Sequence, residues 1–507
     1  MFAKLVSLAV NGIDGYPVQI EVDLGSGLPC FDIVGLPDMA VKEARDRVRA
    51  AIKNSGLGFH DHRITVNLAP ANIKKEGSGF DLPIAIGILT AKGDVNAAKT
   101  GAALFVGELA LDGSVRPVNG MLAMALAARE TGKQYLVHPS ENYNEVAVVP
   151  GIVPVPVASL TQVKQFLNGE WEPDLTVMKV EMNETAASEN DEDLADVKGQ
   201  EQAKRALEVA AAGSHNLLMI GPPGSGKTML ARRLPGILPS LCKEEAIEIT
   251  KIYSVSGLLT QGTSLVKKRP FRAPHHTTSS AGLIGGGRIP RPGEVSLAHF
   301  GVLFLDELPE FGREVLEVLR QPLEDGQVTI ARAATTLTYP ARFMLAGALN
   351  PCPCGFFGDS QKPCSCTPLQ INRYQSRISG PLLDRFDLQI EVPRMQEFDL
   401  DSIPKGESSA SIRQRVEKAR EIQRQRFAGK SYFCNAHMSS KDIRIFCEID
   451  DAGRKLLQQA SQRFLFSARA YTRILKLART IADLEGSKAI EIHHLAEAIQ
   501  YRSLDRR

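Results

Sequence analysis

The stretch Gly221-Pro-Pro-Gly-Ser-Gly-Lys-Thr228 decides the fold of this 507-residue chain. It follows residues 215–220 (His-Asn-Leu-Leu-Met-Ile), which we expect to be a short buried strand, and helical sequence comes next. Glycine at 221, 224 and 226 lets backbone N–H groups close on phosphates without a β-carbon in the way. Lys227 places a charge on the β/γ oxygens, and Thr228 offers a hydroxyl to Mg²⁺. The pattern predicts that ATP phosphates bind to Gly221, Pro222, Pro223, Gly224, Ser225, Gly226, Lys227 and Thr228.

A second apolar run ends in two carboxylates. Val302 to Leu305 has the character of a central parallel strand, and Asp306 and Glu307 follow it directly. We expect Asp306 to hold Mg²⁺ through its water shell and Glu307 to activate the attacking water. The alternative is a strand followed by a solvated acidic turn.

A third expected strand, residues 343–349, ends in Asn350. Doubly wound sheets bind ligands at the carboxyl ends of their strands, so Asn350 is a candidate for orienting the attacking water. Further along, Arg385 stands among acidic and apolar residues, and the residues alone favour a structural ion pair for it.

The length predicts more than one domain. Residues 18–22 and 64–68 alternate as half-buried strands, and residues 41–52 place their apolar side chains on one helix face. The expected fold class is α/β. The expected domains are an N-terminal α/β domain (1–167), an acidic flexible linker (168–195), an ATPase core with a parallel sheet (196–395) and a C-terminal α-helical lid (396–507).

Composition limits the cellular setting. The formal net charge of +2 means that any nucleic-acid surface is local. A run of about 18 apolar residues does not occur, so we expect no membrane span. Eight cysteines in so long a chain do not indicate a disulfide scaffold. We expect a cytoplasmic protein with reduced thiols.

Four motifs resemble a known family. They are residues 35–48 (Gly-Leu-Pro-Asp-Met-Ala-Val-Lys-Glu-Ala-Arg-Asp-Arg-Val), 64–71 (Ile-Thr-Val-Asn-Leu-Ala-Pro-Ala), 272–277 (Arg-Ala-Pro-His-His-Thr) and 292–299 (Pro-Gly-Glu-Val-Ser-Leu-Ala-His). With the phosphate loop, they resemble AAA+ ATPases of the helix-two-insert, pre-sensor-hairpin branch. More narrowly, the chain resembles the magnesium-chelatase-like YifB/ComM family over nearly its whole length.

The resemblance implies roles for three further residues. Asn350 is similar to the sensor-1 residue, and Arg385 to the arginine finger that reaches a neighbouring subunit's nucleotide. In Ser467–Arg473, which resembles the sensor-2 helix, Arg469 is preferred to Arg473. With Lys227, Asp306 and Glu307 these complete a catalytic set. An arginine acting between subunits implies a homohexameric ring.

Two segments resemble pore elements. Residues 327–338 alternate apolar and polar side chains, which suggests a hairpin between the two catalytic strands. Minichromosome-maintenance helicases carry a similar stretch whose lysine faces DNA, and Arg332 occupies that position. A guanidinium there pairs with phosphates irrespective of sequence; the alternative is a surface arginine on an edge hairpin. Residues 285–293 resemble a second pore insert, with Arg288 and Arg291 as further DNA-binding candidates.

The N-terminal domain resembles the proteolytic domain of Lon and the C-terminal domain of the RadA recombination protein, a ribosomal S5 domain 2-like fold, through residues 105–120. Lon-type proteolysis needs a serine nucleophile and a lysine base. By the resemblance to Lon, Gly79 falls at the serine position, with Ser78 one residue away, and Met124 falls at the lysine position. Because methionine is not a base, we expect this domain to be catalytically inactive.

A cysteine cluster follows Asn350. Cys352, Cys354, Cys364 and Cys366 offer four soft ligands within fifteen residues, which is compatible with a tetrahedral Zn²⁺ site. Their Cys-x-Cys spacing is tighter than the usual Cys-x-x-Cys. Free thiols and redox chemistry are the alternatives.

The leading functional hypothesis is a ring-shaped DNA motor that hydrolyses ATP. The resemblance implies a helicase or branch-migration factor in recombination or natural transformation, acting on single-stranded or branched DNA with recombination proteins as partners. The alternative is a protein-remodelling ATPase of the magnesium-chelatase motor-subunit type. A third class, ATP-dependent proteolysis, is disfavoured because the serine–lysine pair is missing.

Overall fold

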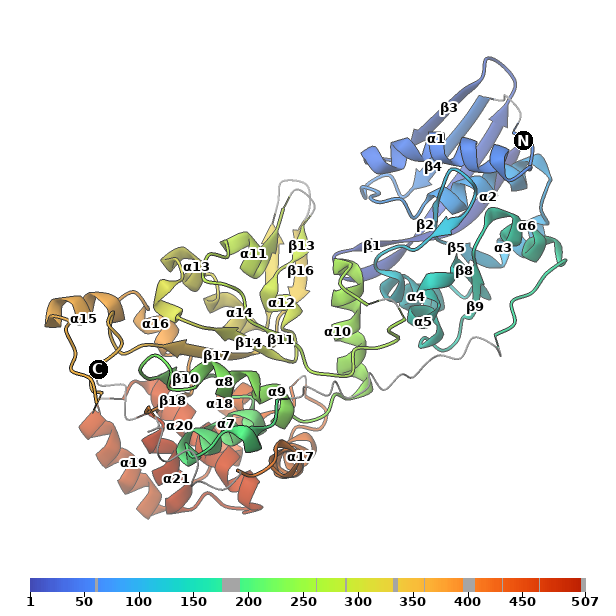
Figure 1. Cartoon of the computed structure of the whole chain (residues 1–507). Helices are drawn as coiled ribbons and strands as arrows, with labels where there is room; N and C mark the ends of the chain where they lie inside the picture. Colours follow the sequence, from blue (N-terminus) through green and yellow to red (C-terminus); the bar gives the residue numbers. More distant parts are fainter. Residues whose placement is uncertain are drawn as a thin grey trace. The chain divides into compact units, whose positions relative to one another are not determined.

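The computed structural model describes residues 1–59, 63–175, 192–260, 262–287, 290–331, 336–359, 361–394, 406–430, 432–464 and 466–502 (Figure 1). The chain divides into two compact units. The first contains residues 1–185 and 246–266, and the second contains residues 186–245 and 267–507. Most of the predicted acidic linker, residues 176–191, lies outside the described residues.

A mixed sheet forms the first unit. Seven of its described strands pair in the order β3-β4-β2-β1-β5-β8-β9. Long antiparallel ladders join β1, β2 and β4, while β5, β8 and β9 continue from β1 in parallel. The strand bounds are β1 Phe2–Asn11, β2 Asp14–Gly25, β3 Cys30–Val34, β4 Arg63–Ala69, β5 Ala103–Phe105, β8 Tyr135–Pro139 and β9 Val153–Val157; β6 Glu108–Leu109 and β7 Val115–Arg116 form a separate pair. The strands predicted at residues 18–22 and 64–68 are confirmed as parts of β2 and β4.

The helix predicted around residues 41–52 is also confirmed. It is α1, Met39–Asn54, and the Asp38 carboxylate caps it by accepting the Val41 N–H at 2.8 Å. Its buried side chains include the four that the apolar spacing selected, Val41, Ala44, Val48 and Ile52, together with Ala51. The other helices of this unit are α2 Asp81–Lys92, α3 Ala97–Gly101, α4 Met121–Glu130, α5 Tyr143–Ala147 and α6 Leu160–Asn168.

One segment from the predicted ATPase core belongs to the first unit. Residues 246–266 include most of α10, Lys243–Ser256, and they pack on the N-terminal fold. Ser254 donates a hydrogen bond to the buried Glu145, and Asn144 Nδ2 donates to the Gly262 carbonyl at 2.7 Å. Burial raises the pKa of Glu145, although its hydrogen bonds from Ser254 and Asn142 oppose that shift. Residues 246–266 were predicted as part of the ATPase core, so their place in the first unit is an unexpected feature of the fold.

A parallel sheet forms the centre of the second unit. Five described strands pair in the order β11-β14-β17-β10-β18. Their bounds are β10 Leu217–Ile220, β11 Phe271–Arg272, β14 Val302–Leu305, β17 Met344–Leu349 and β18 Leu388–Glu391. The three strands predicted before the phosphate loop, Asp306 and Asn350 are confirmed as β10, β14 and β17. Because β17 pairs with both of the others, all three sets of polar residues emerge at one edge.

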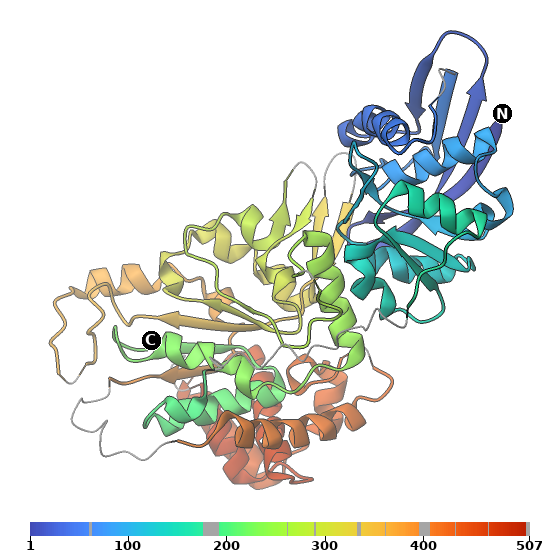
Figure 2. The same ribbon diagram turned by 45° about the vertical axis from the view of Figure 1, so that its right-hand side comes forward.

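Helices surround this sheet, and the C-terminal ones gather on one side of it (Figure 2). They share a single hydrophobic core with the strands, since Leu217 and Phe304 belong to the same buried cluster as Ile474 and Leu495. The helical C-terminal region predicted from about Ser408 is confirmed, and the Ser408 hydroxyl caps α17. The helices are α7 Glu201–Gly213, α8 Lys227–Arg232, α9 Leu234–Ile237, α11 Ser280–Ile284, α12 Glu294–Leu297, α13 Arg313–Glu317, α14 Arg320–Asp325, α15 Pro368–Gln375, α16 Gly380–Leu383, α17 Ser409–Arg426, α18 Ser440–Phe446, α19 Asp451–Phe464, α20 Ala468–Glu485 and α21 Ile492–Gln500.

Two antiparallel pairs project from the second unit. The hairpin predicted over residues 327–338 is confirmed as β15, Gln327–Ala331, paired with β16, Thr336–Pro340. The predicted second insert forms a shorter pair, β12 Gly285–Gly286 with β13 Arg291–Pro292. Among the helices that the structure describes, none combines the length and apolarity needed to cross a membrane.

Candidate functional site

The phosphate-binding loop connects β10 to α8, as predicted. Gly224 and Gly226 adopt φ angles of 77° and 89°, which residues with a β-carbon rarely reach. A β-carbon at Gly221 would lie 2.2 Å from the carbonyl oxygen of Val392. Glycine at these positions is therefore required by the backbone itself.

Lys227 lies at the start of α8 and points back into this loop. Its Nζ donates to the carbonyl oxygens of Gly221 and Pro222 at 2.6 and 2.9 Å, and to Asn350 Oδ1 at 3.2 Å. Burial of the ammonium lowers the pKa of Lys227 to about 8, while the nearby carboxylates of Asp306 and Glu307 act in the opposite direction. The lysine, the loop and the end of β17 thus form one contact network.

Thr228 and Asp306 meet at the next position. The Thr228 hydroxyl donates to Asp306 Oδ2 at 2.6 Å, and the Glu307 N–H donates to Asp306 Oδ1 at 2.9 Å. A hydroxyl and a carboxylate side by side are the hard oxygen ligands that Mg²⁺ prefers. The residues predicted to hold Mg²⁺ are therefore adjacent, and their chemistry fits that ion.

Glu307 has an unusual backbone and an exposed side chain. Its φ of 50° is left-handed, a conformation uncommon outside glycine, and its carboxylate is 57% exposed. His276 Nδ1 lies 3.8 Å from Glu307 Oε2. His276 belongs to the motif at residues 272–277, from which no role for it was predicted.

Gln200 is a second residue that the sequence analysis missed. It immediately precedes α7, and its Nε2 donates to the carbonyl oxygen of Ser225 at 2.7 Å. This side chain therefore supports the phosphate-binding loop from a segment more than twenty residues upstream. The only local sequence feature that could have indicated this role is the Gly199-Gln200 pair before α7, and such a pair is typical of an ordinary helix start.

Arg385 and Arg469 line one cavity of about 430 Å³. Its other charged lining residues are the cations Arg342, Arg473 and Lys476 and the acids Glu324, Asp325, Asp384 and Asp387. Burial lowers the pKa of Arg385, and the positive charges of Arg320, Arg469 and Arg473 act in the same direction. Arg385 pairs with Glu324, which opposes this shift, but its buried Nε has no hydrogen-bond partner among the described residues. Residues 221–228 are not among the described residues that line this cavity.

Arg473 has a different environment from Arg469. It donates to the Phe386 carbonyl at 3.0 Å and lies 3.3 Å from Asp387. Burial would raise the pKa of Asp387, but Arg473 and the hydrogen-bonded His215 together hold it well below its usual range. Arg469 is exposed in the first turn of α20. This difference agrees with the preference for Arg469 as the residue available to a ligand.

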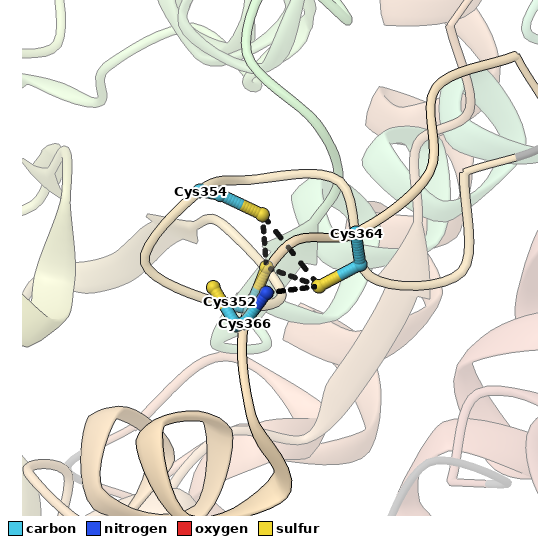
Figure 3. A group of neighbouring side chains, drawn as sticks. All are labelled: Cys352, Cys354, Cys364 and Cys366. Carbon is cyan, nitrogen blue, oxygen red and sulfur yellow. Dashed lines mark hydrogen bonds between the residues drawn. The ribbon is translucent and has the colours of Figure 1, made fainter.

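The four cysteines converge in the loop between β17 and α15 (Figure 3). Their sulfur atoms all lie within 4.8 Å of one another, and three separations are 3.3, 3.6 and 3.7 Å. Zinc held tetrahedrally by thiolates at about 2.3 Å would place the sulfurs about 3.8 Å apart. A disulfide would need about 2.05 Å. The donor set and spacing fit a four-thiolate metal site.

The pKa shifts of the cysteines are also compatible with a metal site. Hydrogen bonds from backbone amides, first that of Phe356, lower the pKa of Cys354 to about 5. The Cys366 amide also lowers the pKa of Cys364, but burial and the thiols of Cys354 and Cys352 outweigh it and raise the value to about 12. Neighbouring thiolates repel one another, so the full set is stabilised by a cation at its centre.

The predicted DNA-binding arginines are only partly described. Arg332 and Arg288 lie outside the described residues. Arg291 is exposed on β13. In the first unit, the Ser78 hydroxyl donates to Glu108, and Met124 is buried on α4, 5% exposed.

A parallel sheet with a glycine-rich loop after one strand and paired carboxylates after another defines the class of P-loop nucleotide-binding proteins. Three family descriptions match this chain: "Magnesium chelatase, subunit ChlI" over residues 193–400, "Subunit ChlI of Mg-chelatase" over 20–142 and "Magnesium chelatase, subunit ChlI C-terminal" over 406–502.

Full-length relatives narrow this class. Competence protein ComM of Haemophilus influenzae is 48% identical over 99% of this chain and 98% of its own length. Protein YifB of Escherichia coli is 45% identical over 98% of this chain and 96% of its own length. The magnesium-chelatase 38 kDa subunit of Cereibacter sphaeroides is 24% identical over 42% of this chain and 62% of its own length. The chain belongs to the YifB/ComM family of magnesium-chelatase-like proteins.

The lowered pKa of Lys227 predicts how nucleotide affinity depends on pH. Below pH 8 the ammonium is charged before nucleotide binds; above pH 8 it must take up a proton, because phosphate favours the charged form. We expect the Kd for an ATP analogue to rise up to about ten-fold per pH unit above about 8. Fluorescence titrations between pH 7 and 9.5 measure this. Lys227→Ala, which binds weakly throughout, should lack this slope, and a flat profile in the parent protein would contradict the assignment.

Proposed function

We propose that this protein binds ATP together with Mg²⁺ and hydrolyses it at the strand ends of the second unit. The observation that carries this proposal is the hydrogen bond between Thr228 and Asp306, with Lys227 bonded to Asn350 beside it. These four side chains come from three separate segments of the chain. Their chemistry matches the needs of phosphoryl transfer: a fixed cation, oxygen ligands for a metal and a polar group facing the reacting phosphate.

Each residue has a distinct task in this proposal. Lys227 neutralises the β/γ-phosphates, and the loop amides bind the phosphate oxygens. Thr228 and Asp306 hold Mg²⁺, which when bound stabilises the charge that develops on the phosphates. Glu307 accepts a proton from the attacking water, and Asn350 orients that water. The exposed carboxylate of Glu307 and its closeness to His276 are compatible with this task.

The site needs a second copy of the chain to be complete. Arg385 and Arg469 share a cavity whose described lining includes no residue of the loop 221–228. Five cations and four carboxylates line this cavity, and the buried Nε of Arg385 has no hydrogen-bond partner among the described residues, so this nitrogen is available to an anion. We assign Arg385 to the nucleotide of a neighbouring subunit and Arg469 to the sensor-2 role. The family resemblance then implies a homohexameric ring.

DNA is the proposed substrate of the motor. A competence protein is 48% identical to this chain over almost its full length, and the two projecting antiparallel pairs are suitable pore elements. Arg291 is exposed on one of them, and we assign Arg288 and Arg332 to the same DNA-binding role. The activity is then helicase action or branch migration on single-stranded or branched DNA, during recombination or natural transformation and with recombination proteins as partners.

A second candidate function is remodelling of a protein partner. It draws on the likeness to the magnesium-chelatase 38 kDa subunit, which is 24% identical over 42% of this chain. That likeness is weaker and shorter than the one to the competence protein. We therefore favour the DNA motor.

We also propose the domain boundaries, the cellular location and the zinc ligands of this protein. The domains are an inactive Lon-like domain (1–167), a linker (168–195), an AAA+ core (196–395) and a lid (396–507), in a protein of the cytoplasm. Cys352, Cys354, Cys364 and Cys366 are assigned to one structural zinc ion.

Glu307→Gln tests the hydrolytic mechanism. The amide cannot accept the proton of the attacking water, so we expect turnover to fall by about 10²-fold or more while Mg²⁺–ATP binding persists. Steady-state hydrolysis and analogue binding measure the two effects. Glu310→Gln, an exposed carboxylate three residues away, is the matched control and should retain activity. Full hydrolysis by Glu307→Gln would remove this residue as the base.

Stimulation of hydrolysis by DNA separates the two candidate functions. We expect forked or branched DNA to raise the ATPase rate several-fold, and a protein remodeller to show no such response. Arg291→Ala and Arg332→Ala should weaken DNA binding and lower the salt slope by about one each, with basal hydrolysis still measurable. Arg454→Ala, an exposed lid residue, is the control. A rate and affinity indifferent to DNA would refute the motor.

A further inference from the structure

The cysteine loop reaches back to the phosphate-binding loop. It runs from Asn350, which accepts a hydrogen bond from Lys227 at 3.2 Å, to Thr367, which caps α15. Near its start the Gly355 N–H donates to the Cys352 carbonyl at 2.9 Å and closes a tight turn. A β-carbon at Gly355 would lie 2.5 Å from Cδ and 2.8 Å from Cγ of Pro223. The backbone of this turn therefore packs directly on the phosphate-binding loop.

Besides the thiols, mainly short-range contacts shape this loop: the Asp359 carboxylate accepts the Gln361 and Lys362 N–H groups, and Gln375 Nε2 donates to the Pro351 carbonyl at 3.1 Å. Between Asn350 and Thr367 the described residues include no helix or strand, so no backbone ladder fixes the course of the chain there. Cys352 and Cys354 lie within the turn, whereas Cys364 and Cys366 come from the returning arm. The sulfur cluster thus joins the turn to the base of α15.

The position of Pro223 links this cluster to nucleotide binding. Pro223 lies between Pro222, whose carbonyl accepts a hydrogen bond from Lys227, and Gly224, whose left-handed backbone opens the loop. A shift of Pro223 moves both neighbours, since adjacent peptide units are rigid planes. The packing of Gly355 on Pro223 therefore helps to hold the loop in the form that accepts phosphates.

We propose that one zinc ion binds Cys352, Cys354, Cys364 and Cys366 and that this ion, by holding the Cys352–Gly355 turn against Pro223, controls the affinity of the phosphate-binding loop for nucleotide. The inference rests on the proposed ATP binding. Loss of the metal frees the turn, removes the support behind Pro223 and weakens binding, although none of the four cysteines is itself assigned to ATP. Nucleotide affinity then depends on metal occupancy.

Two glycines of the same loop provide matched variants. Gly355 and Gly358 have almost equal φ angles, 86° and 80°, so alanine imposes similar backbone strain at each. A β-carbon at Gly355 meets Pro223, whereas one at Gly358 meets no described atom within 4 Å. Gly355→Ala therefore disturbs the contact while leaving the four thiols in place, and Gly358→Ala controls for strain.

The test uses the full chain with Glu307→Gln, so that ATP binds without rapid turnover. Zinc is quantified by mass spectrometry, and the Kd of a fluorescent ATP analogue with Mg²⁺ by titration. We expect about one zinc per chain in this parent. Cys364→Ser with Cys366→Ser should lose the zinc and bind nucleotide about ten-fold more weakly. Gly355→Ala should keep the zinc yet bind about ten-fold more weakly, with Gly358→Ala within about two-fold of the parent.

The outcomes separate the two claims. A parent without zinc, a double serine variant that loses zinc but keeps its affinity, or equal affinities for Gly355→Ala and Gly358→Ala each overturn this inference. The glycine pair keeps the test valid if the double serine variant fails to fold. A zinc-loaded parent that binds no nucleotide overturns the proposed ATP function instead.

Discussion

The hydrogen bond from Thr228 to Asp306 is the interaction on which the site depends. It joins the first turn of α8 to the carboxyl end of β14, about eighty residues further along the chain. In the sheet, β17 lies between β14 and β10, the strand that precedes α8. The pairing requires parallel strands in register, because only then do β10, β17 and β14 deliver their polar residues to one edge. The strand interiors are apolar, so the strand ends are where carboxylate and amide side chains are tolerated. The same constraint that builds the core therefore builds the site.

The charge balance around Arg385 is a second constraint on the structure. Burial lowers the pKa of Arg385, and the positive charges of Arg320, Arg469 and Arg473 add to this shift, which counts against the stability of an isolated chain. Glu324 compensates only part of this charge, since its side chain remains 54% exposed. An anion supplied by another copy would complete the compensation. On the proposed function, the cost of gathering these arginines is recovered when the ring assembles around nucleotide.

Much of the second unit could be predicted from the sequence, because its signals are local. The four apolar residues before Asp306 form a strand with the predicted bounds, and the alternation around residues 327–338 forms the predicted hairpin. The features that could not be predicted from the sequence depend on contacts between residues far apart in the chain. Nothing near residues 246–266 reveals that they pack on the first unit, and the contact between Gly355 and Pro223 joins residues over 130 positions apart. The ion pair between Arg385 and Glu324 also joins distant residues, so its partner could not be predicted from the sequence. The residues alone favoured an ion pair for Arg385, whereas the family resemblance implied an arginine finger.

Completion of each nucleotide site by a second copy of the chain is the central claim, and subunit mixing tests it most directly. Lys227→Ala removes the loop lysine but keeps Arg385, whereas Arg385→Ala does the reverse, and each variant alone should hydrolyse ATP very slowly. In an equal mixture half of the loops are intact and half of those face an intact arginine, so activity should recover to about a quarter of the wild-type rate. A mixture no more active than the variants alone would contradict a site shared between subunits.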